Sequence, residues 1–196
     1  MHLHQWLELV AIAFGILSVW FSKKENIWVY PTGLVNTIVY VYLSFDADLF
    51  GEALANFYYT IMSFYGWYNW LRKDQYRKRV VTITFSNRQQ WMQQLLFFLV
   101  AYGVLFGSLI TVKEAFAPGA IPWADALATA SAFTAMWLMT QKKVEGWIWW
   151  IITNIVSIPL YYVKDLQFTS GYYFILLVLA VAGWVEWGSR AKQNAA

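Results

Sequence analysis

Apolar residues form seven long stretches along the 196-residue chain, and short polar or charged clusters separate them. A helix that crosses a lipid bilayer needs roughly 20 consecutive, mostly apolar residues. Each stretch reaches or nearly reaches that length, so the pattern predicts seven transmembrane helices. We place these helices at about 5–21, 27–45, 50–71, 91–112, 123–141, 146–163 and 169–188.

The loops between the predicted helices are short, and the longest runs from about 72 to 90. Within it, VVTITF (80–85) alternates between apolar and polar residues as a β-strand does. Ser86 is of a residue type that often caps helices, so we expect it to cap the fourth helix. The first helix lacks the basic start and the cleavage site of a signal peptide, so we expect it to be retained.

The composition supports a membrane protein. Hydrophobic residues make up 60% of the chain and charged residues only 13%, whereas a soluble domain carries about 25% charged residues. The absence of cysteine excludes disulfides, zinc–thiolate sites and cysteine nucleophiles. The pI is near 9.0, but the basic residues lie beside the predicted helices, so they indicate membrane topology and not nucleic-acid binding.

Lys and Arg are unequally distributed between the two sides of the predicted membrane. Of the 14 such residues, twelve fall in loops on one side, and only Lys113 and Lys164 fall on the other. Cytoplasmic loops carry an excess of Lys and Arg. The distribution therefore predicts an N-terminus outside the cell and a C-terminus in the cytoplasm.

The motif GWYNW at 66–70 recurs as GWVEW at 183–187, which is 117 positions later. The same offset aligns Trp6 with Trp123 and Trp20 with Trp137. We infer an internal duplication. Within each motif the glycine permits close helix contact and the two tryptophans lie near the membrane interface, so we expect these stretches to serve packing.

The duplication predicts how the helices are arranged. The Lys pairs at 23–24 and 142–143 miss the offset by two positions, which predicts a small insertion or deletion there. A shift of four helices makes the two copies parallel, and a lone helix must join them. The fold class expected is thus an all-α membrane protein, one domain over 1–196, with seven transmembrane helices in a SWEET-like 3+1+3 arrangement. Its parts are a first repeat at about 5–71, a linker helix at about 91–112 and a second repeat at about 123–188. In such carriers the substrate lies between the repeats, near the membrane midplane.

Catalytic groups are scarce in this chain. The only histidines are His2 and His4, and the sequence motifs of metalloproteases, serine hydrolases and P-loop proteins are absent. We therefore expect no enzyme, no metal site and no cofactor. No ionisable residue falls clearly at the midplane of a predicted helix, which favours transport that is not coupled to an ion.

Uncharged polar residues lie among aromatic residues in the predicted helices. Asn56, Thr60 and Ser63 follow one another at i, i+4 and i+7 and share one helix face. Amides without partners are unfavourable in hydrocarbon, so such residues either bond to a neighbouring helix or face a wet cavity. Because both halves contain them, we predict a substrate cavity lined by Trp147, Trp150, Asn154, Asn56, Thr60, Ser63 and Asn36.

Such a cavity suits a flat, polar, cationic small molecule. Aromatic faces stabilise cations, and amides and hydroxyls bind sugar hydroxyls or a carboxamide. An alternative for Trp147 and Trp150 is an aromatic belt at the membrane interface, because Lys142 and Lys143 directly precede them.

Two stretches resemble the PnuC-type vitamin transporter family. NFYYTIMSFYGWYNWL (56–71), followed by the basic loop, is similar to the family's third-helix signature, and EGWIWWIITN (145–154) is similar to its sixth-helix signature. The resemblance covers nearly the whole chain. It implies uptake of nicotinamide riboside across the bacterial inner membrane by facilitated diffusion, with a cytoplasmic kinase that traps the vitamin by phosphorylation.

The resemblance also places Trp147, Trp150 and Asn154 in the site together with the polar stripe of the third helix. Nicotinamide riboside carriers tend to have Gln and Asn where this chain has Asn56 and Ser63. The family also contains thiamine carriers, and thiamine is likewise a flat heteroaromatic cation, so thiamine is the alternative substrate. Family members can form trimers, so a homotrimer is compatible with the resemblance.

Other classes of function fit the sequence less well. A sugar carrier is a further alternative by fold analogy alone. A membrane-embedded enzyme needs a charged catalytic cluster at one face, and a channel needs a continuous polar lining; the sequence shows neither. The partners we expect are a vitamin and the lipid bilayer, and no nucleic acid.

Overall fold

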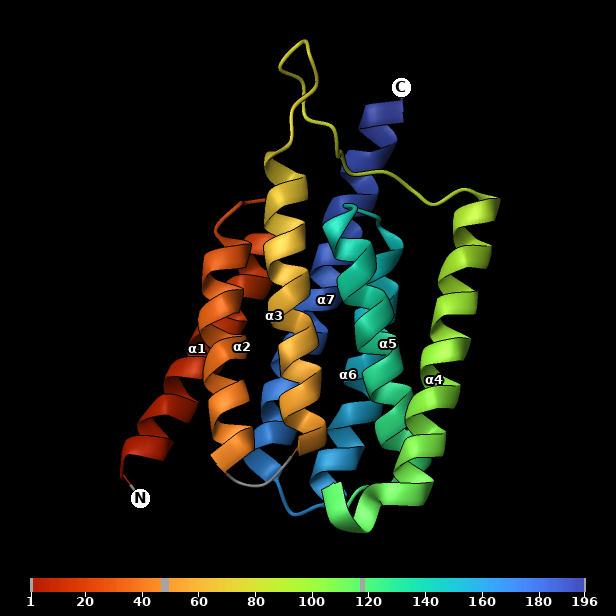
Figure 1. Cartoon of the computed structure of the whole chain (residues 1–196). Coiled ribbons are helices and arrows are strands. Elements are labelled where there is room, and N and C mark those ends of the chain that lie inside the picture. Colours follow the sequence, from red (N-terminus) through yellow and green to blue (C-terminus); the bar gives the residue numbers. More distant parts are fainter. Residues whose placement is uncertain (1, 47–49, 117–118, 196) are drawn as a thin grey trace.

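The chain folds into an all-helical bundle (Figure 1). The computed structural model describes residues 2–46, 50–116 and 119–195. Within these ranges there are seven helices, each lying over one of the seven predicted segments. They are α1 (His2–Lys23), α2 (Val29–Asp46), α3 (Phe50–Leu71), α4 (Arg88–Phe116), α5 (Pro122–Thr140), α6 (Glu145–Val163) and α7 (Gln167–Ala195).

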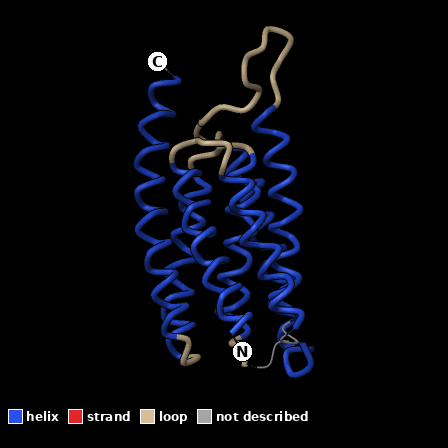
Figure 2. The backbone as a smooth tube through the Cα atoms, turned by 90° about the vertical axis from the view of Figure 1, so that its left-hand side faces the viewer, coloured by secondary structure: helices blue, strands red, loops and turns tan. Residues whose placement is uncertain are grey.

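Four of these helices are apolar and long enough to cross a membrane when judged by length and composition alone: α1, α4, α6 and α7. The other three lack so long an uninterrupted apolar stretch, because Asn, Thr, Ser and Tyr residues are spread along α2 and α3 and small residues along α5. All of the helices run roughly along one axis, with the loops gathered at the two ends (Figure 2). The chain is therefore an all-helical membrane protein.

The two ends of the bundle differ in charge. One end holds residues 24–28, 72–87 and 141–144 together with the C-terminal end of α7 (Figure 1), and we call it the basic end. The loops predicted to share twelve of the 14 Lys and Arg residues do lie together here. The N-terminus and the 164–166 turn lie at the other end, which we call the opposite end.

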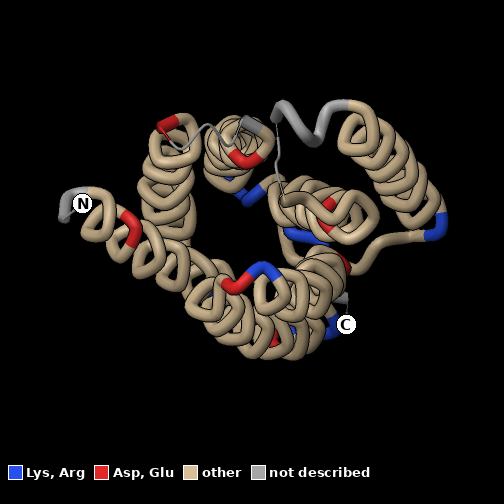
Figure 3. The backbone as a smooth tube through the Cα atoms, turned by 90° about the horizontal axis from the view of Figure 1, so that it is seen from below, with Lys and Arg blue, Asp and Glu red and all other residues tan. Residues whose placement is uncertain are grey.

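The helices have equivalent neighbours in the two halves of the chain. The helix α2 packs between α1 and α3, and α6 packs between α5 and α7. The most extensive helix contacts between the halves are those of α1 with α7 and of α3 with α5. The helix α4 packs against α5 at the edge of the bundle, away from α1 (Figures 1 and 3). Both α1 and α5 run from the opposite end to the basic end.

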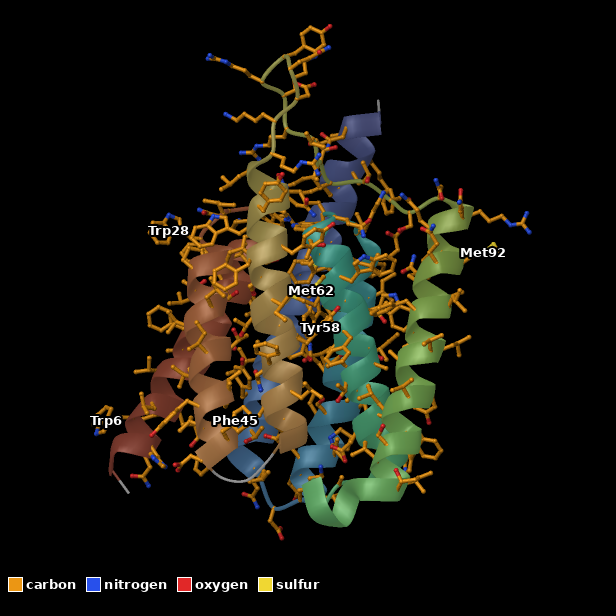
Figure 4. All side chains as sticks on the ribbon, in the orientation of Figure 1. Trp6, Trp28, Phe45, Tyr58, Met62 and Met92 are labelled. Atoms are coloured by element: carbon orange, nitrogen blue, oxygen red, sulfur yellow. The ribbon has the colours of Figure 1, made fainter. Side chains whose placement is uncertain are left out.

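Large apolar side chains cover the outside of the bundle. Trp6, Trp28 and Met92 point away from it (Figure 4), and their exposed fractions are 66%, 58% and 63%. Phe45 is 56% exposed. A soluble monomer rarely exposes so much apolar surface. In a bilayer the same side chains contact lipid, in agreement with the membrane assignment.

The segment 72–87 contains no strand among its described residues. It forms single bridges between Lys73 and Arg79 and between Thr84 and Lys143. The backbone N–H of Thr84 donates to the Lys142 carbonyl oxygen at 3.2 Å, and the side chain of Ile83 is only 1% exposed. The alternating pattern of 80–85 thus reflects one extended stretch that lies against the turn between α5 and α6.

The predicted helix cap at Ser86 is wrong. Asn87 and Gln90 exchange bonds at the start of α4: each backbone N–H donates to the other's side-chain oxygen, at 3.0 and 2.9 Å. This reciprocal capping satisfies N–H groups that have no partner within the helix. The Ser86 hydroxyl instead donates to the carboxylate of Glu145 at 2.7 Å, which fastens the segment to the start of α6.

Candidate functional site

The second tryptophan of each GWxxW motif joins the two halves of the chain at the basic end. The indole N–H of Trp70 on α3 donates to the Met139 carbonyl oxygen on α5 at 3.1 Å. The indole N–H of Trp187 on α7 donates to the Ser22 carbonyl oxygen on α1, also at 3.1 Å. The two bonds are equivalent under the repeat, because Trp187 lies 117 positions after Trp70 and Met139 lies 117 positions after Ser22. The ring centroids of Trp70 and Trp187 are 6.0 Å apart.

The glycine of each motif makes room for an aromatic ring. A Cβ atom on Gly66 would lie 2.5 Å from the Tyr30 hydroxyl oxygen, and one on Gly183 would lie 2.7 Å from the Trp147 ring. Tyr30 and Trp147 are themselves 117 positions apart. Each ring packs edge-on against the second tryptophan of the motif beside it, with centroid distances of 5.2 and 5.5 Å. Glycine is needed at both positions because any side chain would collide with a ring.

A buried ion pair links the turns that follow α1 and α5. The Lys142 ammonium bonds to the Glu25 carboxylate at 2.5 Å, and these residues too are 117 positions apart. Arg79 and Arg190 each lie 3.3 Å from the same carboxylate. The side chain of Lys142 is 1% exposed, and its burial lowers the pKa of the ammonium, although the bond to Glu25 opposes this shift.

The same pair corrects the alignment of the repeat. Glu25 and Lys142 both adopt left-handed backbone conformations, with φ of 57° and 52°. Matching conformations at the 117 offset show that the alignment continues unbroken through these turns. The predicted insertion or deletion is therefore wrong; the Lys pairs differ in position because the sequences of the two turns differ.

Farther along the bundle, one polar contact recurs between helices. The Asn36 amide donates to the Ala11 carbonyl oxygen at 2.7 Å, and the Thr153 hydroxyl lies 3.3 Å from the Ala128 carbonyl oxygen. Thr153 and Ala128 each follow their counterparts by 117 positions. Asn36 and Thr153 therefore occupy equivalent positions in the two halves.

A cavity of about 60 Å³ lies among α3, α5, α6 and α7, in the half of the bundle toward the opposite end. Ala128 and Ala132 on α5 leave space that larger side chains would fill. Tyr161 and Tyr173 stack on one another, with a centroid distance of 5.1 Å and an interplanar angle of 11°. The polar and aromatic residues of the wall are Tyr59, Asp125, Thr129, Thr153, Ser157, Tyr161 and Tyr173.

An ion pair lies where this cavity meets the opposite end. The Lys164 ammonium is 2.8 and 3.0 Å from the two carboxylate oxygens of Asp125. Asp125 also accepts a bond from the Ile121 backbone N–H at 2.6 Å, which holds the carboxylate at the start of α5. The pair connects α5 to the turn after α6.

Four of the predicted site residues lie in the first half of the chain, and in this state they contact neighbouring helices or their own helix. Asn36 bonds to α1, as described above. The Thr60 hydroxyl lies 2.9 Å from both the Thr37 hydroxyl and the Asn56 carbonyl oxygen. The Asn56 amide donates to the Glu52 carbonyl oxygen at 3.0 Å, and Ser63 is buried on α3. None of the four lines the 60 Å³ cavity.

The other three predicted residues lie along α6. Trp147 is 1% exposed and sits at the basic end, and its indole N–H has no hydrogen-bond partner among the described residues. Trp150 approaches Tyr59 of the cavity wall, with ring centroids 6.4 Å apart. Asn154 is 2% exposed, lies one turn before Ser157 of the wall, and leaves its side-chain carbonyl oxygen without a partner in the described part of the chain. Trp150 and Asn154 are therefore next to the cavity, whereas Trp147 is farther away.

The sequence reasoning missed the tyrosines of the cavity. Tyr59, Tyr161 and Tyr173 come from three helices, and no spacing within the sequence connects them. Asp125 and Thr129 do lie four positions apart on one face of α5, so the sequence contains a short polar signal for this wall of the cavity. The signal is weak because α5 is otherwise rich in alanine and lacks an amide residue.

The arrangement provides aromatic faces, hydroxyls and one carboxylate, which together suit a ring that carries positive charge and a hydroxylated group. Ligand pockets for drug-sized molecules are about 300–1,000 Å³. A cavity of about 60 Å³ is far smaller, so a molecule of that size fits only after the surrounding helices move apart. The described residues contain no cluster of three or more His, Asp or Glu able to hold a metal.

Comparisons with known proteins agree with this description. The family model described as nicotinamide mononucleotide transporter matches residues 5–189. The nicotinamide riboside transporter PnuC of Escherichia coli (strain K12) is 25% identical, over 96% of this chain and 87% of that protein. The riboflavin/roseoflavin transporter RibM of Streptomyces davaonensis is 23% identical, with the same coverages. Among solved structures, the crystal structure of the vitamin B3 transporter PnuC is similar, with a TM-score of 0.75, 26% identity, and coverage of 96% of this chain and 83% of that one.

Proposed function

This chain belongs to the nicotinamide mononucleotide transporter family, and we propose that it carries nicotinamide riboside into the cell. The predicted resemblance to PnuC-type transporters, and the prediction that the chain is not an enzyme, are confirmed by relatives named as transporters. We base the proposed substrate class on the tyrosine-lined cavity beside Trp150 and Asn154. It offers rings for a pyridinium and hydrogen-bonding groups for ribose and a carboxamide.

The architecture that we propose is the predicted 3+1+3 arrangement. In it α1–α3 and α5–α7 are parallel repeats, and α4 is the linker. Three kinds of observation support it: the equivalent helix neighbours, the shared direction of α1 and α5, and the contacts that recur at an offset of 117.

The transport cycle follows from where the repeats touch. At the basic end the tryptophan bonds and the ion pair between Glu25 and Lys142 hold the repeats together. We assign this end to the cytoplasm because of its excess of Lys and Arg, which places the N-terminus outside. Rocking of the repeats then breaks these contacts and releases the vitamin inward.

The driving force that we propose is the concentration gradient of the vitamin itself. The carboxylate that lines the cavity, Asp125, is paired with Lys164 and lies near the opposite end, so it is poorly placed to relay an ion across the midplane. Facilitated diffusion alone cannot concentrate a solute. Phosphorylation of the vitamin by a cytoplasmic kinase would trap it inside and keep the gradient inward.

Thiamine is the second candidate, because its cationic ring suits the same tyrosines. Isothermal titration of the purified protein with nicotinamide riboside, thiamine and riboflavin separates the candidates. We expect saturable binding of nicotinamide riboside and none of the other two. Binding of thiamine alone would assign the carrier to thiamine, and no binding of any of the three would overturn the proposal.

A further inference from the structure

A second, larger cavity of about 470 Å³ lies at the basic end, well away from the tyrosine-lined cavity. Its walls come from both halves of the chain and from the long loop. The residues that matter here are Lys24 and Glu25 after α1, Trp70 at the end of α3, Lys73 and Arg79 in the loop, and Lys142 after α5. We call it the basic pocket. Its volume lies within the range of about 300–1,000 Å³ that is typical of small-molecule sites.

The basic pocket and its border carry more positive than negative charge. Glu25 is the only acidic residue in the wall, and it is shared by Lys142, Arg79 and Arg190. Glu186, just outside the wall, pairs with Arg190 at 2.7 Å and more loosely with Lys24 at 3.7 Å. The two carboxylates, Glu25 and Glu186, thus face five cations, which leaves an excess of three positive charges. The cations are Lys24, Lys73, Arg79, Lys142 and Arg190.

The unmatched charge is located at the rim. Lys73 has no ion pair and no side-chain hydrogen bond within the described ranges, and Arg79 is 59% exposed. Among the described residues, the nearby Asp74 forms no ion pair with either of them; its Oδ1 atom accepts bonds from the backbone N–H groups of Tyr76 and Lys78 in the loop tip. The Trp70 ring is covered by Lys142, Tyr30 and Trp187, so it offers no open face for a base to stack on. The chemistry of the pocket is therefore that of an anion site.

We propose that the basic pocket binds the phosphate group of a phosphate monoester, held by Lys24, Lys73 and Arg79. A monoester carries about two negative charges at neutral pH. Lys binds phosphate as a point charge, and Arg binds it with a fork of N–H donors. The shared chemistry is the phosphate group, whether it belongs to a soluble metabolite or to a lipid headgroup at the membrane surface.

The consequence for transport rests on the proposed function. The pocket contains Glu25 and Lys142, whose ion pair holds the two halves together. A ligand that binds only when these walls are in contact stabilises the closed basic end. If the ester is the phosphorylated vitamin, the product of trapping slows further uptake.

The test is isothermal titration of the full-length protein in detergent with inorganic phosphate and with nicotinamide mononucleotide, the phosphate monoester of nicotinamide riboside. The pocket variant is Lys73→Gln/Arg79→Gln. The matched control is Arg77→Gln/Lys78→Gln, which removes the same charge from the tip of the same loop, outside the pocket wall. We expect saturable binding that weakens at least about tenfold in the pocket variant and less than about twofold in the control.

The same proteins in nanodiscs identify the source of the phosphate. Binding of inorganic phosphate or nicotinamide mononucleotide in discs of phosphatidylcholine supports a soluble ligand. If neither binds, but phosphatidic acid raises the melting temperature of the wild type and not of the pocket variant, the site takes a lipid phosphate. The proposal is overturned if neither occurs, or if both variants lose affinity equally.

A titration with nicotinamide riboside on the same preparations keeps the two proposals separate. Vitamin binding without phosphate binding overturns only the basic pocket. Phosphate binding without vitamin binding overturns the assigned substrate and leaves the anion site in place.

Discussion

At Gly183, the backbone of α7 lies directly against the indole ring of Trp147, and at Gly66 the backbone of α3 meets Tyr30 in the same way. The sequence predicted that these glycines allow close contact between helices. It could not identify the partners, because Trp147 is a neighbour of Gly183 only after α6 and α7 have packed. The family resemblance assigned Trp147 to the substrate site, a role that stays a prediction.

Replacement of Gly183 by alanine tests this packing. A Cβ atom would lie 2.7 Å from the Trp147 ring, so we expect Gly183→Ala to destabilise the protein by about 1–3 kcal/mol, as overpacking does. The matched control is Gly103→Ala on α4, where no atom lies within 4 Å of the new Cβ. Melting temperatures in detergent give the comparison, and equal values for the two variants would contradict the account.

The substrate role of α6 is tested at Trp150 and Asn154. Trp150→Ala removes an aromatic face and Asn154→Ala removes an amide whose carbonyl oxygen has no partner among the described residues. Each should weaken binding of nicotinamide riboside by about 1 kcal/mol or more, which is roughly fivefold. The control is Ile155→Ala on the outer face of the same helix, 55% exposed. Titration showing unchanged affinity in well-folded Trp150→Ala and Asn154→Ala would remove both residues from the site.

At the scale of helices, apolar stretches bounded by charges were sufficient to locate all seven elements. The start of α4 was misassigned because the cap depends on reciprocal bonds between Asn87 and Gln90, whereas Ser86 is held by Glu145, 59 residues away. The cavity was only partly foreseen for a similar reason. Its tyrosines come from α3, α6 and α7, and helix periodicity within one segment says nothing about the rotation of another.

The ion pair between the turns after α1 and α5 can be tested by separating its partners. Glu25→Gln leaves the ammonium of Lys142 buried with no carboxylate beside it, so we expect a loss of about 3 kcal/mol in unfolding free energy. The double variant Glu25→Gln/Lys142→Met should recover much of this loss, because it also removes the buried charge that Glu25→Gln leaves without a partner. Thermal unfolding measures both. A double variant less stable than Glu25→Gln alone would refute this explanation.

At the scale of the whole molecule, the charge difference between the two ends predicts the orientation in the membrane. The chain contains no cysteine, so single cysteines can be introduced for labelling. Arg77→Cys lies at the basic end, and Phe168→Cys lies at the opposite end on a side chain that is 95% exposed. A membrane-impermeant maleimide should label Phe168→Cys in intact cells and Arg77→Cys only after permeabilisation. The reverse pattern would place the C-terminus outside.

The central claim is that the chain carries nicotinamide riboside without coupling to an ion. Counterflow in proteoliposomes tests it most directly: vesicles are loaded with unlabelled nicotinamide riboside and diluted into a trace of the labelled vitamin with no ion gradient. We predict transient accumulation of label that excess external nicotinamide riboside abolishes and thiamine does not. Absence of counterflow in vesicles that contain folded protein, or accumulation only with an imposed proton or sodium gradient, would contradict the claim.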